Sequence, residues 1–326
     1  MSTILIASHG PGTGKTSVAA GLAALIARGG AAVSVCKPLS SAGRSDPDAV
    51  YFAQNFRGGV AVASNDDSAS LDAAASAVRS LSGISEHTLV EVANPVSGSG
   101  IASSTTAGLV ERLSARVIAV FGYNTALSAV SVSSDVALLG DALAGVVINQ
   151  VPRYRLAAAG RLLAELNAAG VRAIAALPED RPMLSLTMNQ LEQQLAGHWE
   201  LAPPDGDDWI DRFLIGGNIM DSGAGYFGRF AHQAVITRAE RPDIQMASLM
   251  QNTRCLVLTG GARPTEYIRV EASKREVPVL LVDGGTVATA DAIGDLLGAV
   301  VPYHPHKADR MADLLAERID LTTLLS

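Results

Sequence analysis

The first 28 residues place a glycine-rich turn between a short apolar run and a helical pattern. Residues 3–8 (TILIAS) predict a strand, and residues 15–28 repeat apolar side chains at helical spacing. The turn between them reads SHGPGTGKT over residues 8–16. Glycine permits positive φ angles and close backbone approach, and a helix N-terminus adds partial positive charge. The sequence therefore predicts a loop that binds phosphate groups.

Each residue type in this loop has an expected role. Lys15 is expected to reach the β- and γ-phosphates of a nucleotide, and the Thr16 hydroxyl to bind Mg²⁺. The strict pattern G-x-x-x-x-G-K-[ST] would place glycine at position 9, where this chain has His9. The alternative is a glycine-rich turn with an incidental lysine. The residues predicted to surround the phosphates are Gly10, Gly12, Thr13, Gly14, Lys15, Thr16 and Ser17.

Short apolar runs alternate with helical patterns along the rest of the first half. This alternation is typical of a parallel sheet covered by helices on both faces. We therefore predict an α/β fold with a parallel sheet of the P-loop NTPase type over residues 1–197. Its further strands are predicted at 32–36, 88–92, 116–121, 144–149 and 171–177.

A change of composition divides the chain. Residues 198–209 contain a proline pair, a glycine and three aspartates without a helical period, which predicts a linker. Residues 210–315 resume the strand and helix alternation and predict a second, smaller α/β domain. Residues 316–326 are expected to form a C-terminal tail. Strands of the second domain are predicted at 234–237, 255–259 and 278–282.

Composition excludes several classes of protein. The net charge of −7 argues against a nucleic-acid binder, because phosphate neutralisation needs clustered Lys and Arg. No apolar run approaches the roughly 18–20 residues that a membrane helix needs. The two cysteines, Cys36 and Cys255, stand too far apart in sequence to suggest a zinc motif. We therefore expect a cytoplasmic protein without nucleic-acid or membrane partners.

Three further motifs accompany the phosphate loop. Residues 36–41 (CKPLSS) follow a predicted strand, residues 45–49 (SDPDA) are acidic, and residues 89–91 (LVE) end another strand. With the loop, they resemble the dethiobiotin-synthetase-like P-loop family. The whole chain resembles more closely the N-terminal region of long bacterial phosphate acetyltransferases, in which such a domain precedes a DRTGG domain.

The resemblance implies a set of site residues around ATP and Mg²⁺. Asp48 and Glu91 would join Thr16 at the metal, with Asp46 as the rival of Asp48; either carboxylate could instead be a solvated charge. Lys37 would lie near the γ-phosphate, where Lys15, Lys37 and Ser41 would be the catalytic residues of a ligase.

The same resemblance assigns two residues to the adenine end of the nucleotide. Asn149 resembles the asparagine that reads adenine in the family, although a turn-forming asparagine is the alternative. Pro178 belongs to a P-E-D stretch that would shape the base pocket.

The second half is similar to the DRTGG domain through residues 215–220 (IGGNIM), 234–248 and 258–261. Arg241 and Asp243 could bind an anionic ligand or an adjacent subunit, or they could form a structural ion pair. Near the end of the predicted domain, His304 and His306 could chelate a metal, but no third ligand is evident, and a polar loop is favoured.

Three functions follow from these expectations. We favour an ATP- and Mg²⁺-binding regulatory or sensory protein linked to acyl-phosphate and acetyl-CoA metabolism, with slow ATP hydrolysis compatible. The alternative is an ATP-dependent ligase of the dethiobiotin-synthetase type acting on a small carboxylate or carbamate. A third is a binding module with a vestigial loop. The family implies a homo-oligomer, and a separately encoded acyltransferase is an expected partner, since no sequence remains for an acetyl-transferring domain.

Overall fold

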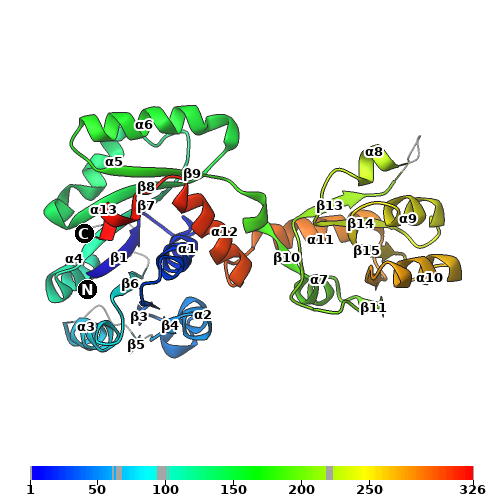
Figure 1. The fold of residues 1–326 in the computed structure, drawn as a ribbon, viewed down its shortest axis with the longest axis horizontal. Coiled ribbons are helices and arrows are strands. Elements are labelled where there is room, and N and C mark those ends of the chain that lie inside the picture. The colour runs from blue at the N-terminus through cyan, green and yellow to red at the C-terminus, as the bar shows by residue number, and fades with distance from the viewer. Residues whose placement is uncertain are drawn as a thin grey trace. The chain divides into compact units, whose positions relative to one another are not determined.

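The chain divides into two compact units in the computed structural model (Figure 1). Unit 1 comprises Met1–Asp180 and Pro302–Ser326, and unit 2 comprises Arg181–Val301. The structure describes residues 2–60, 62–63, 68–93, 101, 103–217 and 223–325. Unit 2 is therefore an insertion, and the chain returns to unit 1 after it.

Unit 1 is built on a seven-stranded sheet in which all paired neighbours are parallel. The strand order is β4-β2-β6-β1-β7-β8-β9, so the opening strand β1 lies at the centre. Short runs rich in Val, Ile and Leu favour this arrangement, because central parallel strands are buried on both faces. The strands are β1 (Ser2–Ser8), β2 (Val33–Cys36), β4 (Arg57–Gly58), β6 (His87–Glu91), β7 (Arg116–Gly122), β8 (Leu143–Val151) and β9 (Ala173–Pro178).

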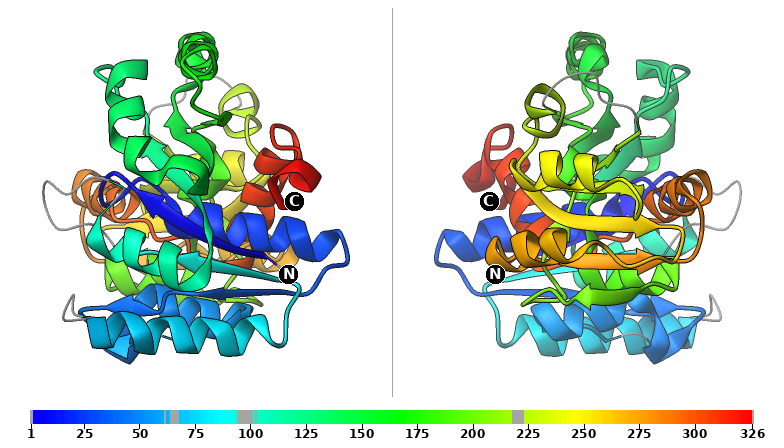
Figure 2. Two further views of the ribbon diagram at one scale, coloured as in Figure 1. Left: turned by 90° about the vertical axis from the view of Figure 1, so that its left-hand side faces the viewer. Right: turned by 90° about the vertical axis from the view of Figure 1, so that its right-hand side faces the viewer.

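Helices cover both faces of this sheet (Figure 2). On one face, helices α3 to α6 pack with alternate strand residues such as Leu5 and Val117 in one apolar cluster. On the other face, α1 contacts β1, β2 and β6. The fold predicted from the alternation of strands and helices is confirmed. The helices before the insertion are α1 (Lys15–Arg28), α2 (Pro47–Asn55), α3 (Ser68–Ser82), α4 (Ser104–Leu113), α5 (Ala129–Val136) and α6 (Leu156–Ala168).

Short elements join these strands and helices. A two-stranded parallel pair lies outside the main sheet, and three 3₁₀ turns connect larger elements. They are β3 (Leu39–Ser40), β5 (Val62–Ala63), η1 (Gly43–Ser45), η2 (Ala137–Ala142) and η3 (Arg153–Arg155).

The returning segment completes unit 1 with α12 (Pro305–Ala316) and α13 (Leu321–Leu325). Helix α12 packs along α1, where a Cβ atom at Gly21 would lie only 2.3 Å from Met311 Cγ. Arg28 of α1 bonds Asp309 and Asp313 at 2.9 and 2.6 Å. The predicted end of the second domain at residue 315 is therefore wrong, because α12 buries its apolar face in unit 1. The polar loop predicted around His304 and His306 is instead the start of this helix.

Unit 2 contains a five-stranded sheet in the order β11-β16-β15-β14-β13, with β11 antiparallel to its neighbour and the others parallel. Its strands are β11 (His198–Leu201), β13 (Arg212–Ile215), β14 (Gln233–Arg238), β15 (Thr253–Thr259) and β16 (Val279–Val282). Its helices are α7 (Met188–Leu195), α8 (Ala224–Phe227), α9 (Pro242–Leu249), α10 (Glu266–Lys274) and α11 (Thr286–Gly298), with η4 (Arg181–Leu184), β10 (Leu186–Thr187) and β12 (Trp209–Ile210) beside them.

The linker predicted over residues 198–209 is wrong at both of its ends. Residues 198–201 form β11, which pairs with β16, and Trp209 pairs with Thr187. Trp199 packs against an apolar cluster of unit 2, which offsets the turn-forming composition around it. No helix among the described residues is both long and apolar enough to cross a membrane.

Candidate functional site

The loop between β1 and α1 presents backbone amides that no described residue uses as donors. Gly12 and Gly14 have φ angles of +71° and +88°, which glycine adopts without steric cost. Among the described residues, no group accepts a hydrogen bond from either amide. Helix α1 has no side-chain cap and no acidic residue in its first turn. The residues predicted to contact phosphates lie together in this loop and first turn: Gly10, Gly12, Thr13, Gly14, Lys15, Thr16 and Ser17.

Two side chains from the end of β8 hold the loop. Asn149 Nδ2 donates to the carbonyl of Thr13 at 2.9 Å, and Gln150 Nε2 donates to the carbonyl of Gly12 at 3.0 Å. A Cβ atom at Gly14 would lie 2.2 Å from Asn149 Nδ2, so glycine is required there. Asn149, predicted to read adenine, thus supports the loop. An amide has a second N–H and an oxygen, so adenine pairing stays a prediction.

Lys15 and Thr16 open helix α1 beside an acidic cluster. Lys15 is only 6% exposed. Burial lowers the pKa of its ammonium, while the nearby charge of Glu91 opposes that shift. Thr16 Oγ1 donates to Asp48 Oδ1 at 3.1 Å. The loop therefore leads directly into two of the three residues predicted to bind a metal ion.

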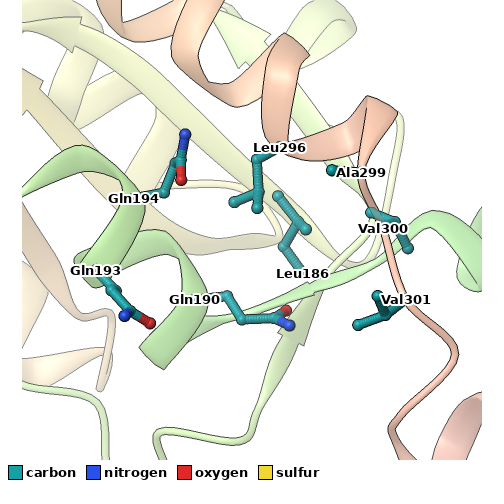
Figure 3. A pocket seen from close by; sticks show the side chains of 8 residues that line it. All are labelled: Leu186, Gln190, Gln193, Gln194, Leu296, Ala299, Val300 and Val301. Carbon is teal, nitrogen blue, oxygen red and sulfur yellow. The ribbon is translucent and has the colours of Figure 1, made fainter. Parts of the chain in front are cut away.

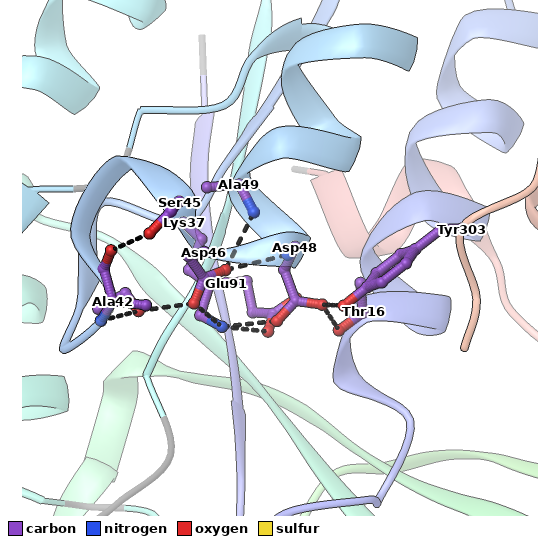
Figure 4. A network of polar contacts seen from close by, with 10 residues as sticks. Thr16, Lys37, Ala42, Ser45, Asp46, Asp48, Ala49, Glu91 and Tyr303 are labelled. Atoms are coloured by element: carbon purple, nitrogen blue, oxygen red, sulfur yellow. Dashed lines mark hydrogen bonds and ion pairs between the residues drawn. The ribbon is translucent and has the colours of Figure 1, made fainter. Parts of the chain in front are cut away.

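Lys37 lies among three carboxylates (Figure 4). Its Nζ is 2.5 Å from Asp48 Oδ2, 2.9 Å from Asp46 Oδ2 and 3.8 Å from Glu91 Oε1. Burial opposes its charge, but the bonds to the carboxylates outweigh burial and raise the pKa of Lys37. Its ammonium is therefore charged and already paired.

The start of helix α2 separates the roles of the two rival aspartates. Asp46 is the N-cap, and its Oδ1 accepts from the amides of Asp48 and Ala49 at 3.0 and 3.1 Å. Aspartate followed by proline at the first helical position is a strong helix start. Its other oxygen accepts from Ser40 Oγ at 2.6 Å. Asp46 is thus used by the fold, whereas Asp48 points its carboxylate toward Thr16.

Glu91 is a buried carboxyl at the end of β6, next to the central strand, where it pairs in register with Ile6. It is 2% exposed, and its Oε2 atom has no hydrogen-bond partner among the described residues. Burial, together with the charge of Asp48, raises the pKa of Glu91 to about 8. An unsatisfied buried oxygen of this kind is costly unless a ligand completes it.

These residues fit a magnesium ion held partly by a nucleotide. Within the described residues, no group of three or more His, Cys, Asp or Glu could hold a metal by itself. Mg²⁺ usually takes only one or two carboxylates and fills its octahedral shell with phosphate oxygens and waters. The unsatisfied Glu91 oxygen and the hydroxyl of Thr16 are suitable ligands, and the loop amides would bind the nucleotide's phosphates, whose oxygens would complete the shell.

Two predicted residues lie elsewhere. Ser41 is exposed, and the hydroxyl in the acidic cluster belongs to Ser40. Pro178 ends β9, where it pairs with Val151, two residues before Asp180. Asp180 accepts a two-nitrogen bond from Arg310 of α12, at 2.8 and 2.7 Å. In this structure the P-E-D stretch therefore anchors the returning segment.

The sequence did not point to Tyr303, whose hydroxyl donates to Asp48 Oδ1 at 2.9 Å. It is separated from Asp48 by 255 positions, and no motif marks it. Gln150 was also missed, although its neighbour Asn149 was singled out. Its φ angle of +59° is unusual for a residue other than glycine and could not be read from the sequence.

Unit 2 holds a separate hollow of a different character (Figure 3). Its volume is about 490 Å³, and no charged side chain lines it. Three glutamines of α7 face apolar residues around the end of α11. The lining residues are Leu186, Gln190, Gln193, Gln194, Leu296, Ala299, Val300 and Val301.

The pair left open in unit 2 is an ion pair. Arg241 bonds both oxygens of Asp243, at 2.9 and 2.7 Å, and also the carbonyl of Gly217 at 2.8 Å. Residues 218–220 of the motif noted nearby lie outside the described residues.

Two family patterns match the sequence. Residues 2–185 match the family described as an AAA domain, which is of the P-loop, dethiobiotin-synthetase-like kind, and residues 192–296 match the DRTGG domain. The resemblance predicted from the motifs is confirmed. A phosphate acetyltransferase of Nitratidesulfovibrio vulgaris is 26% identical over 181 residues, covering 49% of this chain and 24% of that protein. The chain thus spans about a quarter of the length of this relative.

Solved structures show weaker similarity. The signal recognition particle 54 kDa protein of Aeropyrum pernix, in complex with GDP, is 15% identical over 55% of this chain and 41% of that one, with a TM-score of 0.41. A MinC:MinD cell division protein complex of Aquifex aeolicus is 15% identical over 56% of this chain and 84% of that one, with a TM-score of 0.41. The CBS and DRTGG domains of a Clostridium perfringens pyrophosphatase are 14% identical over 36% of this chain and 49% of that one, with a TM-score of 0.30.

Proposed function

The chain belongs to the AAA domain family matched by residues 2–185, and on this premise we propose that unit 1 binds ATP with Mg²⁺. One observation carries the proposal: the amides of Gly12 and Gly14 have no acceptor within the described part of the chain, at the N-terminus of an uncapped helix. Such amides and the helix dipole favour a phosphate group.

The charges beside the loop support a triphosphate with its metal ion. Lys15 would meet the β- and γ-phosphates, while Thr16, Asp48 and Glu91 would hold Mg²⁺ directly or through water. The metal supplies charge neutralisation for the phosphates when it is bound. Burial, with the charge of Asp48, holds the pKa of Glu91 above its ordinary value, and a bound cation would favour the charged form.

A regulatory role is favoured over the ligase alternative. Lys37, which would hold a carboxylate or carbamate substrate, is already paired with three carboxylates of the protein, and Ser41 is exposed. A substrate anion would have to displace those bonds. We therefore propose that ATP binding, with slow hydrolysis at most, changes what the DRTGG domain presents to a partner.

The proposal also includes a link to acyl-phosphate and acetyl-CoA metabolism. It is supported by the match to about a quarter of a phosphate acetyltransferase. We propose a separately encoded acyltransferase as partner and a homo-oligomer as the functional form. Light scattering with and without ATP, followed by pull-down of purified acyltransferases, tests both statements.

Equilibrium binding of a non-hydrolysable ATP analogue tests the central claim. Lys15→Ala should weaken binding at least tenfold, because it removes the buried ammonium at the loop. Lys274→Ala is the matched control, since it removes an exposed lysine of unit 2. Equal affinities of Lys15→Ala and the wild type would show that the loop is not the site.

A further inference from the structure

The returning segment touches the candidate metal site through one side chain. Tyr303 follows the last residue of unit 2 by two positions, and its Oη donates to Asp48 Oδ1 at 2.9 Å. Burial and the negative charge of Asp48 raise the pKa of Tyr303, so its hydroxyl keeps the proton and acts as a donor. Its ring lies 5.4 Å from the ring of Tyr51.

Both oxygens of the Asp48 carboxylate accept hydrogen bonds in this arrangement, two on Oδ1 and one on Oδ2. Figure 4 shows Asp48 between Lys37 on one side and Thr16 with Tyr303 on the other. Oδ1 accepts from both Thr16 and Tyr303, and Oδ2 accepts from Lys37. A carboxylate offers about four lone-pair directions in all, two on each oxygen. Both directions of Oδ1 are therefore taken.

Of the two donors on Oδ1, only Tyr303 competes with a cation. The Thr16 hydroxyl can keep its proton on Asp48 while its own oxygen faces a metal, because a hydroxyl is both donor and acceptor. Tyr303 fills the other direction of Oδ1, the one that a cation bound to this oxygen would take. If Mg²⁺ is to bind Asp48 through Oδ1, that oxygen must therefore first lose its bond to Tyr303.

The contacts of the residues around Tyr303 limit which part of the chain can move when the metal site is filled. Immediately after it, His304 caps α12, and α12 is fixed along α1 by Arg28 and by Met311 packed on Gly21. Asp180, at the other end of the insertion, is held by Arg310 of the same helix. The short segment of Pro302 and Tyr303 is thus the connection to unit 2 that also bonds to the site.

We propose that Tyr303 is a latch that occupies Asp48 when no metal is bound and is released when Mg²⁺ and nucleotide bind. The inference rests on the proposed function of unit 1 and adds its regulation. Metal and latch compete for one oxygen, so each weakens the other by the same factor. The connection that leads into the DRTGG domain would thereby differ between the two states of the site.

Nucleotide affinity tests the competition. Tyr303→Phe removes only the hydroxyl and should tighten binding of a Mg²⁺–ATP analogue on the order of tenfold, the value of one hydrogen bond to a charged group. Binding of the analogue in EDTA should not change. Tyr51→Phe is the matched control, because its hydroxyl is buried beside Tyr303 without a hydrogen-bond partner among the described residues.

Hydrogen exchange of the wild type supplies a second readout that needs no variant. Adding Mg²⁺ and the analogue should speed exchange of the amides of Tyr303 and His304, and the analogue with EDTA should not. Weaker or unchanged Mg²⁺-dependent binding in Tyr303→Phe, or unchanged or slower exchange in the wild type, would overturn the latch while leaving the nucleotide site standing. A wild type that binds no analogue at all would instead overturn the proposed function.

Discussion

In each unit, one arginine donates from two nitrogens to the two oxygens of an aspartate, an arrangement called an arginine fork below. The bond lengths in the two forks are nearly identical. Arg310 bonds Asp180 at 2.8 and 2.7 Å in unit 1, and Arg241 bonds Asp243 at 2.9 and 2.7 Å in unit 2. Their surroundings differ, since the side chain of Asp180 is 1% exposed and that of Asp243 is 63% exposed. Bond length alone therefore does not tell what a charge does in this molecule.

The same contrast holds for the candidate ligand sites. In unit 1, buried charges lie at the carboxyl end of β6 and at the start of α1, where Glu91 is 2% and Lys15 6% exposed. The hollow in unit 2 has glutamine and apolar walls. Perturbed, buried charges are characteristic of functional sites, so unit 1 is where binding chemistry is expected. The following predictions test this contrast between buried and exposed charge.

The largest effect is expected at Glu91, whose pKa of about 8 lies far above the ordinary value of 4.5. Between these values the folded state binds a proton that the unfolded state has released, so stability falls as pH rises from about 4.5 to about 8. Glu91→Gln should lack this fall. In EDTA near pH 8.5 it should be more stable than the wild type, by on the order of 5 kcal/mol.

Hydrogen exchange of the α1 and β1 amides at several pH values measures this difference in unit 1. Tryptophan fluorescence would not, because both tryptophans, Trp199 and Trp209, lie in unit 2. A difference between variant and wild type that stays constant from pH 5.5 to 8.5 would show that Glu91 is ionised in the folded protein.

The next largest effect is expected in a comparison of the two arginine forks. Asp180→Ala should destabilise unit 1 by roughly 2–3 kcal/mol, because it removes charged hydrogen bonds from a buried position and loosens α12. Asp243→Ala removes a fork of the same geometry from an exposed position and should leave the stability of unit 2 unchanged.

Exchange of α1 amides reports the first variant and tryptophan fluorescence during urea unfolding reports the second. If both variants lose the same stability, exposure is not what distinguishes the forks.

Sequence reasoning located the strands, the phosphate loop and the second domain, because these depend on local periodicity and on glycine at fixed spacing. The run TILIAS became β1, and 234–237, 255–259 and 278–282 became β14, β15 and β16. It could not locate the return of the chain to unit 1. Nothing in the composition of residues 302–316 distinguishes a helix that packs on α1 from one that packs in unit 2.

Side-chain direction was the other limit. Asp46 and Asp48 are equally acidic in sequence, and only the cap geometry of α2 assigns one to the fold and leaves the other at Thr16. Long-range contacts such as Tyr303 to Asp48 have no local signal at all. The sequence could thus narrow the candidate site residues to short motifs, but only the three-dimensional structure shows which residue of a motif lies in the site.

The smallest effect should separate two adjacent serines, and it tests that choice directly. Ser40 donates to Asp46 at 2.6 Å from a buried position, whereas Ser41 is exposed. Ser40→Ala should cost about 1–2 kcal/mol, because a buried carboxylate loses a donor. Ser41→Ala should change stability by less than about 0.5 kcal/mol, as exposed substitutions usually do.

Exchange of the α2 amides measures both variants, since Asp46 caps that helix. The bond from Ser40 also helps to hold the pKa of Asp46 below its ordinary value, against the opposing effect of burial. That pKa should rise in Ser40→Ala and stay constant in Ser41→Ala. A larger loss from Ser41→Ala than from Ser40→Ala would mean that the exposed hydroxyl carries a structural role that its surroundings do not explain.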